Sequence, residues 1–174
     1  MAYYYTPFRN TYAKERDGDI CALCDPQTIE RQGVKDGAGA LVQNKHFVWL
    51  VNFFPKFEGH TMIVPKRHLV SLYDETPEEA VSRNEILKIA AAAIQKLYPG
   101  SGIEFFFQTG ANSQSSIKHL HWHLTPSLPN DPLRSFEKLG HFYTTKEGEE
   151  KTIVFPIKIE KAKEALQDAL SKII

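Results

Sequence analysis

Cysteine, excess charge of one sign and long hydrophobic runs are all scarce in this sequence. Its only two cysteines are Cys21 and Cys24, too few for a disulfide framework. The 21 side chains of Lys and Arg balance 21 of Asp and Glu, so we expect no nucleic-acid polymer as a partner. No apolar run approaches the length of a membrane span, and the N-terminus lacks a basic start followed by an apolar stretch. We therefore expect a cytoplasmic protein without a membrane partner.

The size of the chain predicts one globular domain. It has 174 residues, of which 42% are hydrophobic and 24% charged, and this composition suits a soluble domain with a substantial core. Residues 1–20 show no regular pattern, so we expect an N-terminal arm there. Residues 21–174 then form a single domain, with a C-terminal extension from about residue 127. In a reducing compartment, the C-x-x-C spacing of Cys21 and Cys24 points to metal or redox chemistry.

Hydrophobic patterning predicts an α+β fold. Short apolar runs between turn residues predict strands at residues 40–43, 47–52, 60–64, 103–107 and 117–125. A long helix is expected over residues 76–97, because Thr76 can cap it and Pro77 fits its first position. Its apolar stripe comprises Val81, Ile86, Ile89, Ala90, Ala93 and Leu97. We expect an antiparallel sheet of about five strands with its helices on one face.

The same periodicity predicts a helix at the C-terminus. Its apolar positions are Ala162, Leu166, Ala169, Leu170 and Ile173. Their spacing of three and four residues places them on one side of a helix, where they can pack on the sheet. We therefore expect this helix to be part of the scaffold.

Three of the seven histidines alternate with large apolar residues in the segment His119-Leu120-His121-Trp122-His123-Leu124. A strand has a side-chain period of two, so the histidines would share one face and the apolar residues the other. Near neutral pH, an imidazole can act as a nucleophile, a proton carrier or a metal ligand. Attack on phosphorus also needs donors for the phosphate oxygens. The hydroxyls of Ser115 and Ser116, just upstream, suit that role.

The alternating segment resembles the histidine triad (HIT) motif, in which three histidines alternate with hydrophobic residues. Upstream, Gly59-His60-Thr61-Met62-Ile63-Val64-Pro65-Lys66-Arg67-His68 is similar to the family's second recurrent segment. The order of the expected elements agrees as well, and the resemblance covers roughly residues 20–127. It implies a HIT-like fold and a nucleotide hydrolase or nucleotidyltransferase that works through a covalent nucleotidyl-histidine intermediate.

The resemblance also implies roles for individual residues. His121 would be the nucleophile on the α-phosphate, and His123 would contact the phosphate. Asn52 falls where the family binds the ribose. Gln108 and Ser116 fall at positions that contact phosphates in family members.

Other positions are less specific. Many family members carry a glycine at the position of Gln114, which puts the approach of that loop to the phosphate in doubt. His46 and His60 are interpreted as a turn residue and a packing residue. The family usually forms a homodimer by joining two sheets, and the resemblance implies the same here.

Cys21 and Cys24 resemble a zinc-bearing subset of the superfamily. In that subset, the C-x-x-C pair is completed by the histidine that ends the upstream segment and by the first triad histidine, which are His68 and His119 here. Two sulfurs and two imidazoles make a closed set of four ligands, which is typical of a structural zinc ion. A free, reduced thiol pair is the alternative.

The sequence leaves several functions open. The leading hypothesis is hydrolysis of a dinucleoside polyphosphate or a nucleoside phosphoramidate. A phosphorylase or nucleotidyltransferase is the alternative, since the triad together with C-x-x-C is reminiscent of diadenosine tetraphosphate phosphorylases. His123 argues against a hexose-1-phosphate uridylyltransferase, which has Gln at that position. A nucleotide-binding regulatory protein and a metal-binding module are further hypotheses.

Overall fold

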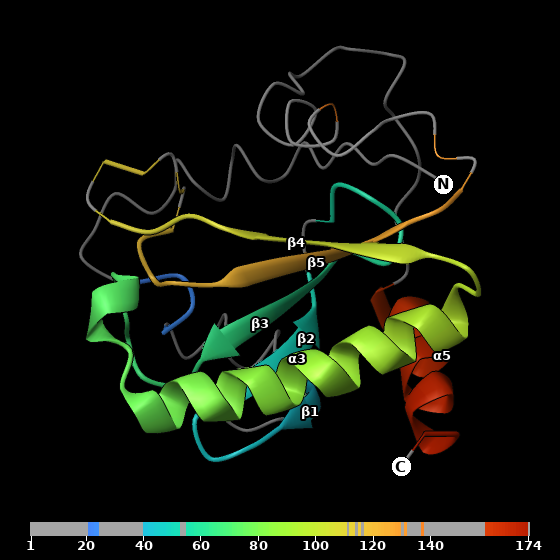
Figure 1. The fold of residues 1–174 in the computed structure, drawn as a ribbon, viewed down its shortest axis with the longest axis horizontal. Coiled ribbons are helices and arrows are strands. Elements are labelled where there is room, and N and C mark those ends of the chain that lie inside the picture. Colours follow the sequence, from blue (N-terminus) through green and yellow to red (C-terminus); the bar gives the residue numbers. More distant parts are fainter. Residues whose placement is uncertain are drawn as a thin grey trace.

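The protein is described from a computed structural model (Figure 1). The described residues are 21–24, 40–52, 55–110, 112–113, 115, 117–129, 131, 137 and 159–173. The expected arm at residues 1–20 therefore lies outside them. So do Ser116, Gln114 and most of the extension that follows residue 131.

A five-stranded antiparallel sheet forms the centre of the fold. Its strands are β1 (Ala40–Gln43), β2 (Phe47–Val51), β3 (Thr61–Pro65), β4 (Gly102–Phe107) and β5 (Trp122–Ser127). They lie in the order β1-β2-β3-β5-β4, so β4 is an edge strand and β5 has a neighbour on each side. Met62 of β3 and Phe106 of β4 both pair with His123 of β5. The predicted α+β fold is confirmed.

The two predicted helices are α3 (Pro77–Leu97) and α5 (Ile159–Ser171), and a short 3-10 helix, η1 (Leu72–Asp74), precedes α3. Thr76 caps α3 as expected, and Glu79 completes a capping box with it. In Figure 1, α3 runs along the sheet and α5 lies beside the end of α3 that leads to β4. Among the described residues, no helix is both long and apolar enough to cross a membrane.

The sheet has a different core on each face. Helices α3 and α5 pack on the face that carries Leu120, Trp122 and Leu124. The opposite face buries a smaller cluster of Leu23, Val48, Leu50, Met62 and Val64. Each fully buried large side chain of this kind contributes about 2–3 kcal/mol. The predicted separation of apolar residues from histidines along the triad segment is thus confirmed, and the C-x-x-C segment packs on the histidine face.

The triad strand differs from its prediction at both ends. It begins at Trp122, not at residue 117, because the amide of Leu120 donates to the carbonyl oxygen of Leu69 outside the sheet ladder. It runs on to Ser127, although the strand was expected to end at residue 125. Pro126 lies past the last pair between β5 and β3, where β5 has a neighbour on one side only, so its missing N–H is tolerated.

Two predicted packing residues are exposed. Val81 is 60% exposed, because the buried face of α3 continues toward its N-terminus through Glu79 instead. Ile173 follows the last residue of α5 and is also exposed. In α3, the charged residue Glu79 therefore lies on the buried face where Val81 was expected, and a hydrophobic pattern does not predict such a position.

Candidate active site and metal-binding cluster

His121 lies immediately before β5 and is 9% exposed. Its Nδ1 donates a hydrogen bond to the carbonyl oxygen of His119, at 2.7 Å. A neutral imidazole with its proton on Nδ1 carries its lone pair on Nε2. The backbone of the preceding histidine therefore fixes both the orientation and the tautomer of His121, in the form that a nucleophile needs.

His123 is held by a histidine that the sequence analysis treated as a packing residue. The Nε2 of His60 lies 2.9 Å from the Nδ1 of His123, and the backbone N–H of Lys56 donates to the Nδ1 of His60 at 3.0 Å. His60 must therefore present its own N–H to His123, whose remaining proton is then on Nε2. The ring of Phe106 stacks on His123 at 4.9 Å. The signal available in the sequence was the place of His60 in the upstream segment.

Only some of the residues expected to contact a nucleotide are placed near His121 and His123. Asn52 is buried, and its side-chain nitrogen lies 3.4 Å from the Nδ1 of His60, which carries the lone pair of that ring. Gln108 follows the pair Phe107 and Trp122 at the end of β4, next to the start of β5. Ser115 donates to the carbonyl oxygen of Ile117, so its hydroxyl orders its own loop. Ser116 lies outside the described residues.

A second cluster joins four side chains from three distant segments. The ligand atoms of Cys21, Cys24, His68 and His119 all lie within 4.8 Å of one another. The Nδ1 of His119 is 3.5 Å from the sulfur of Cys21 and 3.3 Å from that of Cys24. The Nδ1 of His68 is also 3.3 Å from the sulfur of Cys24. Two thiols and two imidazoles at this spacing can hold one metal ion.

The surroundings of His119 suit a metal ligand. Burial, with a smaller contribution from the neighbouring His68, lowers the pKa of His119 to about 4, so the ring is neutral at pH 7. Its Nε2 donates to the carbonyl oxygen of Pro65 at 3.0 Å, which leaves the lone pair on Nδ1, toward the sulfurs. A metal-binding histidine commonly gives its other N–H to such an acceptor.

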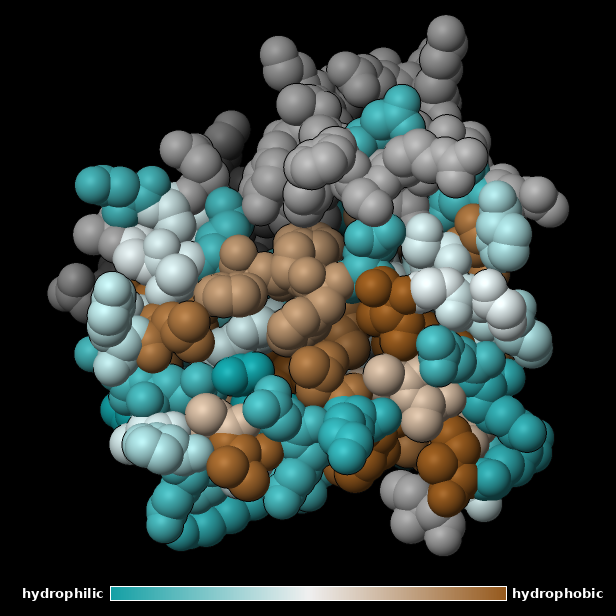
Figure 2. Space-filling view, viewed as in Figure 1, coloured by the Kyte–Doolittle hydropathy of each residue, from teal (hydrophilic) through white to brown (hydrophobic). Residues whose placement is uncertain are grey.

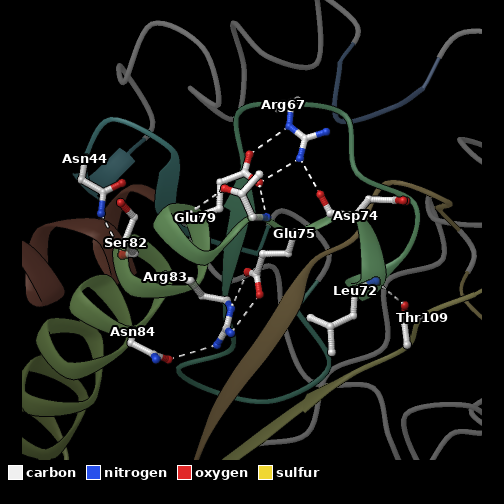
Figure 3. Close-up of polar contacts among 11 residues, drawn as sticks. Asn44, Arg67, Leu72, Asp74, Glu75, Glu79, Ser82, Arg83, Asn84 and Thr109 are labelled. Atoms are coloured by element: carbon white, nitrogen blue, oxygen red, sulfur yellow. Dashed lines mark hydrogen bonds and ion pairs between the residues drawn. The ribbon is translucent and has the colours of Figure 1, made fainter.

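Two arginines form ion pairs with carboxylates near the start of α3 (Figure 3). Arg67 forms a two-pronged ion pair with Glu79, and Arg83 forms another with Glu75. The guanidinium of Arg83 also lies 5.0 Å from the ring centroid of Trp122, on the helix face of β5. The sequence indicates only that Arg67 belongs to a short basic pair and that Glu79 suits the start of a helix; it does not indicate that the two residues pair.

This arrangement of elements and histidines agrees with a known family. The HIT domain family matches residues 36–130, more than half of the chain. The protein belongs to the HIT domain family. The resemblance inferred from the triad and the upstream segment is thereby confirmed.

Curated relatives of this HIT protein differ in activity. It is 28% identical over 133 residues to the galactose-1-phosphate uridylyltransferase of Thermotoga maritima, covering 75% of this chain and 38% of the relative. It is 30% identical over 100 residues to the bis(5'-adenosyl)-triphosphatase of Dictyostelium discoideum, covering 58% and 64%. It is 28% identical over 133 residues to the AP-4-A phosphorylase of Mycobacterium tuberculosis, covering 73% and 68%. The chain thus spans less than two thirds of the first two relatives.

Solved structures share the fold. A zinc-bound histidine triad family protein from Mycobacterium smegmatis matches with a TM-score of 0.55 at 20% identity, covering 78% of this chain and 87% of that one. A uridylyltransferase matches with a TM-score of 0.66 at 20% identity, covering 96% of this chain and 50% of that one. Identities this low establish the fold alone.

Proposed function

We propose that the protein is a nucleotide hydrolase that cleaves a nucleoside phosphate bond through a covalent nucleotidyl-histidine intermediate. The observation that carries the proposal is the 2.7 Å hydrogen bond from the Nδ1 of His121 to the carbonyl oxygen of His119. It sets the Nε2 lone pair of His121 as the nucleophile. Dinucleoside polyphosphates and nucleoside phosphoramidates are the proposed substrates, and the Dictyostelium triphosphatase supports the first class.

In the first step, the Nε2 of His121 forms a bond to the α-phosphorus. The bond from that phosphorus to the leaving group breaks, and the leaving group keeps the electron pair and takes a proton from solvent. The Nε2–H of His123, fixed by His60, donates to a non-bridging oxygen as charge redistributes. In the second step, water attacks the phosphorus, the electron pair of the P–N bond returns to His121, and a proton leaves to solvent. The product is a nucleoside monophosphate.

We assign the nucleotide contacts to residues around this pair. Asn52 is proposed to bind the ribose, and Gln108 and Ser116 are proposed to bind phosphate oxygens. Ser115 is proposed to do the same when its hydroxyl turns from the carbonyl oxygen of Ile117 to the phosphate. The support is that Gln108 lies one residue beyond the pair Phe107 and Trp122, beside the nucleophile, while Asn52 contacts His60. A panel of nucleotides tests the function: His121→Ala should lose turnover of every substrate that the wild type cleaves, and full retention would contradict the proposal.

A phosphorylase or nucleotidyltransferase is the second candidate. In these enzymes inorganic phosphate or a sugar phosphate, in place of water, resolves the same intermediate. The alignments to the AP-4-A phosphorylase and the uridylyltransferase cover more of this chain than that to the triphosphatase, which favours this candidate. Comparing the nucleotide products with and without inorganic phosphate separates the two functions. A nucleotide-binding regulator would show binding that survives His121→Ala and negligible turnover by the wild type.

We propose that Cys21, Cys24, His68 and His119 hold one structural zinc ion. The support is their mutual spacing within 4.8 Å and a donor set of two thiols and two imidazoles, which leaves no open position on a tetrahedral ion. When bound, the ion would cross-link the C-x-x-C turn, the loop after β3 and the segment that leads into β5. Metal analysis should find one zinc per chain, and Cys24→Ser should lose it. A metal content unchanged by that substitution would contradict the assignment.

We also propose a homodimer that joins the sheets of two copies through β4. This strand is at the edge of the sheet, and Phe105 and Phe107 on its helix face are each 37% exposed. Figure 2 shows apolar side chains gathered in the middle of the face that this view presents. Light scattering should give twice the mass of the chain. Phe105→Glu with Phe107→Glu should reduce it to the mass of one chain, whereas an unchanged mass would refute this interface.

A further inference from the structure

A buried carboxylate at the start of α3 has no part in the proposed chemistry. Glu79 is 4% exposed, and its two oxygens accept from the Nε and Nη2 of Arg67 at 2.9 and 2.8 Å (Figure 3). Such a fork has a fixed planar geometry. The pair therefore constrains the position of Arg67 more strongly than a single contact between two flexible side chains does.

The anchor of this pair is itself fixed. Glu79 accepts a hydrogen bond from the backbone N–H of Thr76 at 2.8 Å, and the hydroxyl of Thr76 accepts from the backbone N–H of Glu79 at 3.2 Å. Arg67 also donates to the carbonyl oxygen of Asp74 at 2.7 Å. The first turn of α3 and the preceding η1 thus hold the Nε and Nη2 of Arg67.

His68 follows Arg67 directly and is exposed. Its ring meets the buried ring of His119 edge to face, with 4.9 Å between the centroids, and the backbone on either side of His68 sets where the ring begins. After it, Leu69 is 1% exposed, and its carbonyl oxygen accepts from the amide of Leu120 at 2.6 Å. Before His68, the ion pair with Glu79 holds the side chain of Arg67, the preceding residue. Between these two attachments, the Nδ1 of His68 lies 3.3 Å from the sulfur of Cys24.

We propose that the Arg67–Glu79 pair positions His68 as a metal ligand and thereby sets the metal affinity of the four-residue cluster. This inference rests on the zinc site proposed above. The physical reason is pre-organisation: a ligand that is already in place loses little conformational freedom on binding the ion. Residues that orient the ligands of a metal ion without touching the ion typically affect metal affinity by 10- to 100-fold.

The sharpest variant is Glu79→Gln, because glutamine still accepts from the N–H of Thr76 in a capping box but cannot offer two charged oxygens to Arg67. Glu78→Gln is the matched control, since it removes the same charge from the same turn. The Glu78 side chain is 79% exposed, and it lies 3.9 Å from the ammonium group of Lys45, which is itself exposed. Arg67→Lys, which keeps the charge without the fork, is the second test variant.

Zinc affinity is measured on the full chain by competition with a chromophoric chelator, and Co²⁺ serves as a spectroscopic probe of the ligands. Glu79→Gln and Arg67→Lys should bind zinc about tenfold more weakly than the control. Their Co²⁺ absorption should also weaken, because the loss of the His68 ligand disturbs the tetrahedral site. If Glu79→Gln does not fold, Arg67→Lys alone decides.

The outcomes distinguish this inference from the zinc proposal. If both folded variants match the control in zinc affinity and Co²⁺ spectrum, the Arg67–Glu79 pair only stabilises the loop, and the inference is wrong. The zinc proposal is not affected by that result. If the wild type binds no zinc, or Cys24→Ser binds it equally well, the zinc proposal fails and the inference fails with it. Equal losses of thermal stability with and without zinc would also overturn it, because a positioning role must destabilise the loaded form more.

Discussion

The carbonyl oxygen of His119 accepts the hydrogen bond that orients His121, at 2.7 Å, while the imidazole of His119 faces the sulfurs of the C-x-x-C pair. The proposed nucleophile and the proposed metal cluster are therefore joined through a single residue, which takes part in one through its backbone and in the other through its side chain. Substitutions along the triad should consequently separate metal binding from chemistry.

His119→Ala is expected to lose metal before anything else. The side chain is 1% exposed, and its removal deletes a ligand and leaves the carbonyl of Pro65 without its donor. We expect the free energy of unfolding to fall by at least about 2 kcal/mol, with loss of bound zinc. Urea denaturation and metal analysis measure both effects, with His46→Ala, a turn residue, as the control. Full zinc content in His119→Ala would contradict the ligand assignment.

His60→Ala should slow turnover without removing the nucleophile. The hydrogen bond at 2.9 Å that holds His123 is lost, so the donor to the phosphate oxygen is misplaced. We expect kcat to fall about 100-fold, with zinc content unchanged because His60 lies outside the metal cluster. Steady-state kinetics test this expectation. A kcat equal to that of the wild type would show that His60 only packs against its neighbours.

Glu79 should govern part of the acid stability. The hydrogen bonds from Arg67, followed by those of Thr76, lower the pKa of Glu79 from 4.5 to about 2 against the opposing effect of burial. A carboxyl with a lowered pKa stabilises the fold above its usual pKa, and that stability is lost as the pH falls from about 4.5 toward 2. We expect about 1–2 kcal/mol, because Arg67 is half exposed and water screens the pair.

Denaturant titrations between pH 6 and pH 3 measure this contribution. The free energy of unfolding of the wild type should decline more steeply than that of Glu79→Gln, in which the titrating group is absent. Glu78→Gln should follow the wild type. Parallel curves for all three proteins would show that Glu79 is not stabilised as a carboxylate.

Local patterns predicted most of the fold. The alternation of Leu120, Trp122 and Leu124 with the histidines gave the correct faces, and Thr76 with Pro77 marked the start of α3. These signals are local, because they depend on a periodicity or a cap within a few residues. The prediction failed at Val81, where a charged residue with a distant partner replaces an apolar one on the inner face.

The candidate site needed more than local patterns. Only the family resemblance related Cys21 to His119, since ninety-eight residues separate them in the chain. The contact of His60 with His123 and that of Arg67 with Glu79 depend on how strands and helix pack, and no spacing in the sequence encodes them. Such long-range polar contacts appear only when the tertiary structure is known.

The most direct test of the central claim is mass spectrometry of the protein quenched during turnover of a nucleotide substrate. We predict a mass increase of one nucleoside monophosphate group, located by peptide mapping on His121 and absent from His121→Ala. Because the nitrogen-phosphorus bond is labile in acid, the quench should be alkaline. Two results would contradict the account. One is rapid turnover with the adduct on a residue other than His121, and the other is turnover that persists in His121→Ala.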